Sequence, residues 1–128
     1  YTNNSVIVTS DARLKTARPY EAKERAVARR CRDLGVVYQW NDAIAQKGVD
    51  RARRHFGTTV QSVIAAFEAE GLDPMRYGVV CYDEWEAEVI EHPAIEGREA
   101  YTETVRQAGN RYSLRLDQLA FFIVTAGA

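Results

Sequence analysis

The clearest helical pattern lies in the middle of the chain, where four apolar residues recur at positions i, i+3, i+4 and i+7. These residues are Val60, Val63, Ile64 and Phe67. The spacing predicts a helix that buries this face, with Thr58 or Thr59 as its N-cap and Gly71 beyond its end. A second helix, with a narrower apolar stripe among basic side chains, is predicted over residues 20–34, before Gly35.

A third helix is predicted near the C-terminus, with Asp117 as its N-cap. One of its faces consists of Leu119, Phe122, Ile123 and Ala126. Phe121 and Val124 make the other side apolar as well. A helix that is apolar all round is either buried in its own domain or packed against identical helices of sister chains. We expect the second arrangement.

Strands are predicted between the helices from β-branched composition. The segments are residues 5–10, 36–40 and 77–82. A β-hairpin is predicted with strands 102–107 and 111–116, because Gly109 and Asn110 between them accept the positive φ of a tight loop.

The remaining segments have weaker patterns. Residues 43–54 are interpreted as a loop or an exposed helical turn, and the acidic residues 84–100 as an irregular surface excursion. The expected fold class is α+β, with a small antiparallel sheet, two or three helices and the C-terminal helix packed against its copies in sister chains.

Size and composition indicate one ordinary globular domain. The chain has 128 residues, of which 46% are apolar and 27% charged, and its net charge of −1 gives no global attraction to nucleic acid or to a membrane. No apolar run is long enough for a membrane span. Because Tyr1 is not a start methionine, we expect a piece of a longer protein.

The charges are unevenly distributed along the chain. Residues 1–57 hold twelve of the seventeen basic side chains, whereas residues 83–103 hold eight acidic side chains and one arginine. These regions could attract each other within one chain or between copies, or could be two solvated faces.

Most enzyme classes are excluded by missing motifs. The sequence has no Gly-rich phosphate loop, no H-E-x-x-H and no G-x-S-x-G, and its two histidines, His55 and His92, are too few for a multi-histidine metal site. Cys31 and Cys81 lack metal-binding spacing and are expected to stay reduced. We therefore expect neither a cofactor nor a metal.

A polar cluster directly after the first predicted strand could carry chemistry. Ser10 and Lys15 are five residues apart, so a turn could bring the hydroxyl and the amine together. A serine is a weak nucleophile until a base takes its proton, and a lysine with a lowered pKa can be that base. Arg13 and Arg18 are candidate cationic neighbours. Alternatively, Ser10 or Asp11 only caps a helical turn while Lys15 extends into water.

The order of several motifs resembles one family from about Val6 to the end of the chain. The motifs are S-D-A-R-L-K followed by R-P, Y-Q-W, R-R-H-F-G-T-T-V-Q-S-V, G-L-D-P-M-R-Y-G-V-V-C-Y-D-E-W and R-Y-S-L-R-L-D-Q-L. This arrangement is similar to the C-terminal intramolecular chaperone auto-processing domain, of the endosialidase type, of phage tailspikes and tail fibres.

The resemblance implies roles for particular residues. Ser10 matches the nucleophile and Lys15 the base of a self-cleaving Ser-Lys dyad, and His55 matches a histidine important for processing, although a lone histidine is more often a hydrogen-bonded structural residue. Gln61 and Asp117 match recurrent polar positions with structural roles, and Asp11 is a supporting residue.

The resemblance also implies a biological setting. Residues 1–10 would be the end of an upstream fibre region with the cleavage-site strand, and residues 11–128 the chaperone domain. The domain would form a homotrimer in which the C-terminal helices pack together, assist folding of the upstream β-helix in the host cytoplasm, and be released from a virion tail fibre precursor. No nucleic acid or membrane partner is expected.

The position of the cut follows from ring size. Attack of the Ser10 hydroxyl on the carbonyl of Thr9 passes through a five-membered ring, so the Thr9-Ser10 bond is favoured over Ser10-Asp11. Two other functions stay open, namely a trimerisation cap that does not cleave and a basic nucleic-acid-binding module.

Overall fold

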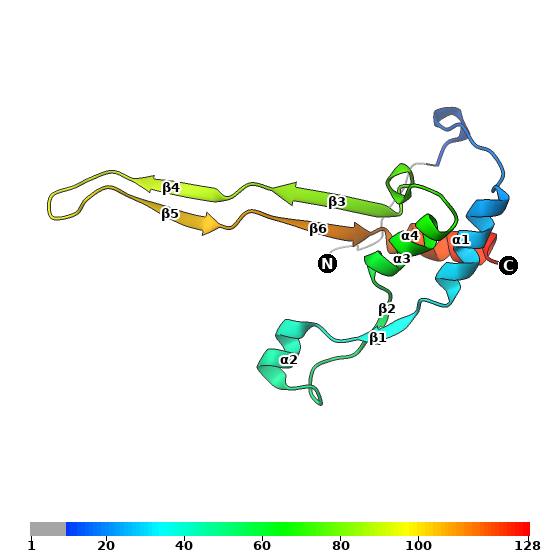
Figure 1. Cartoon of the computed structure of the whole chain (residues 1–128), viewed down its shortest axis with the longest axis horizontal. Helices are drawn as coiled ribbons and strands as arrows, with labels where there is room; N and C mark the ends of the chain where they lie inside the picture. Colours follow the sequence, from blue (N-terminus) through cyan, green and yellow to red (C-terminus); the bar gives the residue numbers. More distant parts are fainter. Residues whose placement is uncertain (1–9) are drawn as a thin grey trace, which may run out of the picture.

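Three helices with the predicted apolar faces build the body of the domain. In the computed structural model, which describes residues 10–128, these are α1 (Ala22–Arg32), α3 (Val60–Ala69) and α4 (Leu116–Ala126). Figure 1 shows them gathered at one end of the molecule. The helical prediction for these three segments is therefore confirmed.

The core lies between these helices and the start of the strand that follows α3. Its buried members are Val27, Cys31, Val63, Ala66, Phe67, Val79, Val80 and Leu119. Phe67 is 1% exposed, and its ring packs 4.9 Å from the ring of Tyr77 and 6.3 Å from that of Phe122, measured between centroids. Thr59 caps α3, as predicted, by accepting a hydrogen bond from the amide of Ser62.

A long two-stranded arm projects from this body (Figure 1). Its inner half pairs β3 (Val80–Trp85) with β6 (Gly109–Leu114), and its outer half pairs β4 (Glu88–His92) with β5 (Tyr101–Arg106), both antiparallel. The predicted hairpin between residues 102–107 and 111–116 is wrong, because β5 and β6 follow each other along the same side of the arm. The acidic segment 84–100 is mostly strand and turn rather than an irregular excursion.

Two glycines explain why the sequence predicts the chain reversal at residues 109–110, whereas the structure has it at Gly97. The chain reverses at Gly97, which has φ of 84° and lies between Ile95 and Arg98, whose backbones bond to each other at 3.0 and 3.1 Å. Gly109 is not among the glycines with positive φ. It lies opposite Trp85, and a Cβ atom there would be 2.8 Å from the indole ring. Gly109 thus makes room for a cross-strand aromatic side chain.

A smaller unit, residues 36–57, extends from the body in another direction than the arm (Figure 1). β1 (Val36–Tyr38) pairs antiparallel with β2 (His55–Gly57), and α2 (Asn41–Lys47) lies between them in sequence. The strand predicted over residues 36–40 is confirmed, and residues 43–54 include a short helix followed by loop. Two 3₁₀ turns complete the described elements, η1 (Ala12–Leu14) and η2 (Pro74–Arg76).

The α+β class is confirmed, with four α-helices in residues 10–128 and strands arranged as three two-stranded antiparallel sheets. Asp117 is not the N-cap of α4, because the chain enters the helix directly from β6 and Arg115 takes that position. The strand predicted over residues 5–10 lies outside the described residues except for Ser10. Among residues 10–128, none of the helices has the length and apolar character needed to span a membrane.

Candidate functional site

Ser10 and Lys15 are in direct contact. The turn η1 lies between them, closed by backbone bonds from Leu14 to Asp11 (3.0 Å) and from Lys15 to Ala12 (3.3 Å). It brings Nζ of Lys15 to 2.8 Å from Oγ of Ser10, where the ammonium donates to the hydroxyl. An amine that has lost its proton could accept the hydroxyl proton in this geometry.

Asp11 supports the turn. Its carboxylate accepts a bond from the backbone amide of Arg13 at 2.9 Å and pairs with the guanidinium of the same residue at 2.6 Å. These bonds from Arg13 lower the pKa of Asp11. Asp11 is therefore the cap of this turn, which was one of the two roles considered from the sequence. It also stabilises the turn that brings Ser10 and Lys15 together.

The two predicted cationic neighbours of Lys15 are each neutralised by a carboxylate. Arg13 pairs with Asp11, and Arg18 pairs with Glu24 at 2.7 Å. Ser10 and Lys15 are both exposed. In the single chain, Ser10 and Lys15 therefore contact each other while both side chains are exposed.

Ser10 lies on the wall of a groove of about 850 Å³ beside the helical body. The groove is lined by Ser10, Thr16, Ala17, Arg18, Tyr20, Glu24, Phe67, Tyr77, Gly78, Val79, Asp117, Gln118, Phe121 and Phe122. Asp117, from the first turn of α4, shares this groove with Ser10. The apolar part of its wall comes from the core and from the exposed side of α4.

His55 and Gln61 lie elsewhere. His55 is on β2, where its ring stacks on Tyr38 with centroids 5.3 Å apart. In Figure 1, β2 lies on the opposite side of the helices from η1. Gln61 is exposed on the first turn of α3. The structure thus brings Ser10, Lys15 and Asp11 together, with Asp117 across the groove, and does not bring His55 or Gln61 to them.

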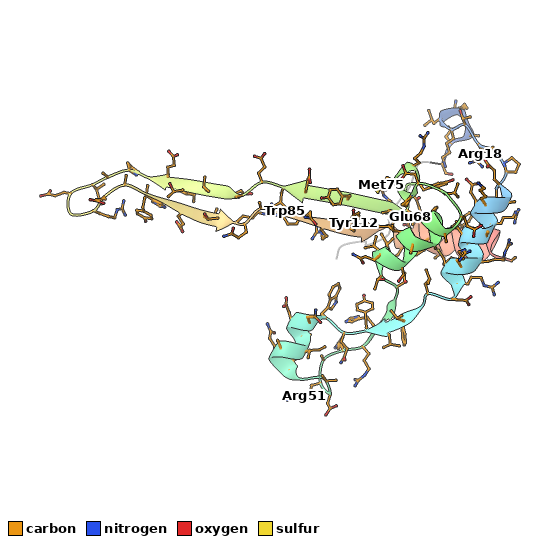
Figure 2. The ribbon with its side chains drawn as sticks, viewed as in Figure 1. Arg18, Arg51, Glu68, Met75, Trp85 and Tyr112 are labelled. Atoms are coloured by element: carbon orange, nitrogen blue, oxygen red, sulfur yellow. The ribbon has the colours of Figure 1, made fainter. Side chains whose placement is uncertain are left out.

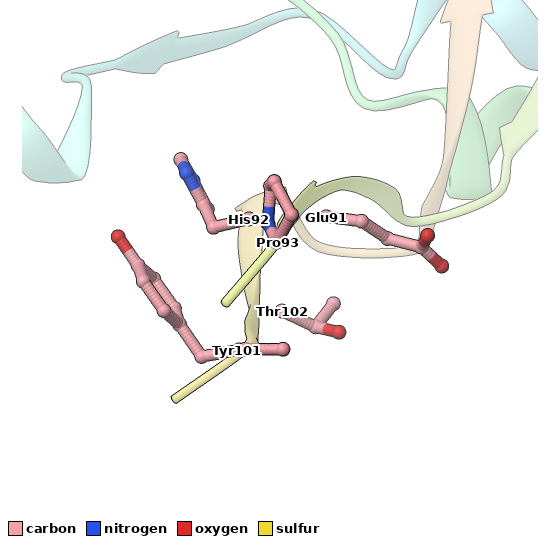
Figure 3. A pocket seen from close by; sticks show the side chains of 6 residues that line it. Glu91, His92, Pro93, Tyr101 and Thr102 are labelled. Atoms are coloured by element: carbon pink, nitrogen blue, oxygen red, sulfur yellow. The ribbon is translucent and has the colours of Figure 1, made fainter. Parts of the chain in front are cut away.

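A second hollow, of about 340 Å³, lies near the tip of the arm (Figure 3). There the ring of His92 stacks on that of Tyr101 at 4.5 Å, and Nε2 of His92 lies 3.0 Å from a carboxylate oxygen of Glu103. These contacts account for His92 as a structural residue of the arm. Residues 10–128 hold no group of three His, Cys, Asp or Glu side chains placed to bind a metal ion.

One buried polar residue was missed in the sequence. Glu24 is 5% exposed and accepts bonds from Arg18, Tyr77 and the amide of Glu21. A signal was present, because Glu24 precedes Val27 and Cys31 by three and seven residues and so falls on the buried stripe of α1.

Solved structures with this architecture are intramolecular chaperone domains. The chain superposes on the carboxy-terminal domain of the bacteriophage T5 L-shaped tail fibre with its intra-molecular chaperone domain, with a TM-score of 0.75, 34% identity, and coverage of 99% of this chain and 30% of that one. A structure described as a novel intramolecular chaperone gives a TM-score of 0.71 and 34% identity, covering 91% of this chain and 93% of that one. The fold thus defines the class as an intramolecular chaperone domain.

Sequence comparisons identify the family. Residues 10–72 match the family model described as chaperone of endosialidase. The chain is 36% identical over 119 residues to a tail spike protein of Escherichia virus K5, and 37% identical over 132 residues to the side tail fiber protein pb1 of Escherichia phage T5. These alignments cover 93% and 96% of this chain but 18% and 9% of the relatives. The chain belongs to the chaperone of endosialidase family.

Proposed function

We propose that this domain trimerises, assists folding of an upstream tailspike or tail fibre region, and then releases itself by cutting its own chain at Thr9-Ser10. The observation that carries the proposal is the 2.8 Å contact between Lys15 Nζ and Ser10 Oγ in a domain of this family. The family model is also named as a peptidase family.

The exposed side of α4 supports assembly. Phe121 is 68% exposed and Val124 is 75% exposed, and Leu116 on the first turn is exposed as well. Large apolar side chains gathered on one helix face mark a protein interface. Three copies of α4 packed along this face would bury it.

The arm supports action on a partner. A two-stranded ribbon alone is marginally stable in water, yet this arm carries exposed apolar side chains along both of its halves. They include Tyr82, Val89, Ile90, Ile95, Tyr101, Val105 and Tyr112. The upstream fibre region of the same trimer is the partner that we propose for this surface. Aligning three long chains in this way would favour β-pairing that is otherwise slow.

The cleavage chemistry uses the protein's own groups. Lys15 takes the proton of Ser10, and Oγ attacks the carbonyl carbon of Thr9. The bond from that carbon to the Ser10 nitrogen breaks, and the nitrogen receives the proton, which leaves an ester between Thr9 and Oγ. Water then hydrolyses the ester, giving a carboxylate on Thr9 and a new amino terminus on Ser10.

Assembly would activate the dyad by removing water. A lysine amine surrounded by water is protonated at neutral pH and cannot act as a base. Ser10 and Phe121 line the same groove, so a neighbour packed on α4 would also close the groove beside Ser10. Burial favours the neutral form of an amine. Cleavage would then follow trimer formation although Ser10 and Lys15 already touch in one chain.

His55 keeps its proposed part in processing. Because its ring contacts Tyr38 and not the dyad, it would act either by supporting the β1-β2 ribbon or from a neighbouring subunit. A His55→Ala variant that still forms trimers but cleaves more slowly than the wild type would show that His55 acts on processing and not only on folding.

The test uses the chain fused behind its native upstream region. Ser10→Ala and Lys15→Ala variants are expected to form trimers that keep full-length chains on a denaturing gel, whereas the wild type is shortened. Lys47→Ala, which changes an exposed lysine at the end of α2, is the matched control and should be shortened normally. Unchanged shortening in both dyad variants would refute the dyad. Trimers without shortening in the wild type would indicate a non-cleaving cap.

A nucleic-acid-binding module has less support. Arg30 on α1 bonds to Glu70 at 2.7 Å, and Nη1 of Arg32 donates to the carbonyl of Gly127 at 2.8 Å. These contacts hold two of the basic side chains of α1, which such a module would need for binding phosphates, against the body. Salt-sensitive retention of the chain on DNA would support that module instead.

A further inference from the structure

The segment that carries the dyad has few attachments to the body of the domain. No residue of η1 is buried. Within residues 10–128, the hydrogen bonds made by residues 10–15 stay inside this segment. If assembly is to close the groove beside Ser10, something further along the chain must hold the turn in place against the body of the domain.

Arg18 makes that attachment. It follows Lys15 by three residues, at the point where the chain passes from η1 to α1 (Figure 2). Its Nη1 and Nη2 donate to the two carboxylate oxygens of Glu24 at 2.8 and 2.7 Å. The same Nη1 also donates to the carbonyl of Pro19 at 3.0 Å. A two-pronged contact of this kind fixes orientation as well as distance.

Glu24 is itself held from two further directions. The backbone amide of Glu21 donates to one of its oxygens at 2.8 Å, which completes the N-terminal cap of α1. The hydroxyl of Tyr77 donates to the other oxygen at 2.9 Å. The ring of Tyr77 in turn packs on Phe67 in the core. Glu24 therefore connects Arg18, through Tyr77, to the buried core of the domain.

A buried carboxylate is costly unless it is paired, and Glu24 is the one charged residue that is buried within residues 10–128. Arg18 chiefly accounts for the lowered pKa of Glu24, about 2, so the carboxylate is charged at any pH at which a lysine base could operate. The same groove is lined by Ser10, Arg18, Glu24 and Tyr77. The anchor and the Ser10 hydroxyl thus belong to the wall of one groove.

We propose that Arg18, Glu24 and Tyr77 are positioning residues for self-cleavage, because they anchor the Ser10-Lys15 turn to the core. This inference rests on the proposed function. Arg18, the arginine of the R-P motif, would then affect the cleavage rate separately from trimer assembly and from the stability of the fold.

The experiment measures the cleavage rate per assembled oligomer, purified by size, for the chain behind its native upstream region. Arg18→Ala should cleave about 100-fold more slowly than the wild type, as a displacement of about 1 Å at a reacting group can cause. Arg18→Lys, which keeps the positive charge but cannot donate to both carboxylate oxygens in the same planar geometry, should recover part of that rate.

Arg30→Ala is the matched control. It removes an arginine-carboxylate contact of the same length between α1 and the end of α3, away from η1. It should cleave within about twofold of the wild type, since exposed ion pairs contribute little. An Arg18→Ala rate equal to that of the wild type would overturn the inference. Equal slowing in Arg18→Ala and Arg30→Ala would also overturn it, because general destabilisation would then explain both.

Ser10→Ala separates this inference from the proposed function. Cleavage in Ser10→Ala would refute the dyad and the anchor together. An inactive Ser10→Ala beside a fully active Arg18→Ala would refute the anchor alone.

Discussion

Replacing Gly109 with alanine should weaken the arm by displacing the indole of Trp85. A Cβ atom at position 109 would lie 2.8 Å from Cζ2 of that ring, which is closer than two non-bonded carbon atoms approach each other. If the ring moves, it loses the bond from its Nε1 to the carbonyl of Gln107 at 3.0 Å. The ring also loses its cation–π contact with Arg106, whose Cζ lies 4.5 Å from the ring centroid.

The magnitude follows from these two contacts. A hydrogen bond contributes a net ~1 kcal/mol, and an exposed cation–π contact contributes about 0.5–1 kcal/mol. Alanine is better than glycine inside a strand by about 0.5–1 kcal/mol, which offsets part of the loss. We expect the arm to open more easily by about 1 kcal/mol, and its backbone amides to exchange about fivefold faster.

Hydrogen exchange read by mass spectrometry over residues 80–114 measures this effect. Gly35→Ala is the control, because apart from Gly35 and its two neighbours in the chain no heavy atom lies within 4 Å of the position of its Cβ. In a Trp85→Ala background, Gly109→Ala should slow exchange instead, since only the gain in strand propensity remains. Slower exchange of Gly109→Ala in the native background would refute the steric argument.

Three further predictions concern the core, the buried carboxylate and the helix interface. Phe67→Ala should reduce the free energy of unfolding by about 3–5 kcal/mol, measured by denaturant titration, because it empties the centre of the core; a loss below about 1 kcal/mol would contradict that packing. The folded pKa of Glu24, about 2, lies below its usual value of 4.5, so its contribution is complete above about pH 4.5 and is lost as the pH falls toward 2. The loss should be at most about 3 kcal/mol, and Glu24→Gln should flatten unfolding curves over this pH range; an unchanged slope would contradict the pairing. Phe121→Asp with Val124→Asp should abolish trimers in sedimentation experiments, whereas Ala65→Asp, at an exposed position on α3, should not; intact trimers in the double variant would exclude this face as the interface.

The helices and the contact between Ser10 and Lys15 were predictable because their signals are local. The i, i+3, i+4, i+7 pattern of α3 follows from burial of one helix face, and the order S-D-A-R-L-K places Ser10 and Lys15 across one turn. The path of the arm was not predictable in this way. Gly109 satisfies the composition of a turn, and only the position of Trp85 on the opposite strand explains why it is a glycine.

Part of the surroundings of Ser10 and Lys15 depends on contacts between distant segments. Tyr77 is fifty-three residues from Glu24 in sequence, so nothing local indicates their hydrogen bond. Arg13 and Arg18 were recognised as cations near Lys15, but their pairing with Asp11 and Glu24, two and six residues away, was not predicted. The N-cap of α4 was misassigned to Asp117 for a related reason, since β6 continues to Leu114 and the helix starts immediately afterwards.

Native mass spectrometry of the wild-type chain behind its upstream region shows whether cleavage requires assembly, because one spectrum gives both the copy number and the mass of each chain. Complexes of three copies should contain chains that begin at Ser10, while single copies should remain uncut. Single copies that begin at Ser10 would show that cleavage does not need the trimer, and trimers whose shortened chains begin at Asp11 would show that the Ser10-Asp11 bond is cut instead.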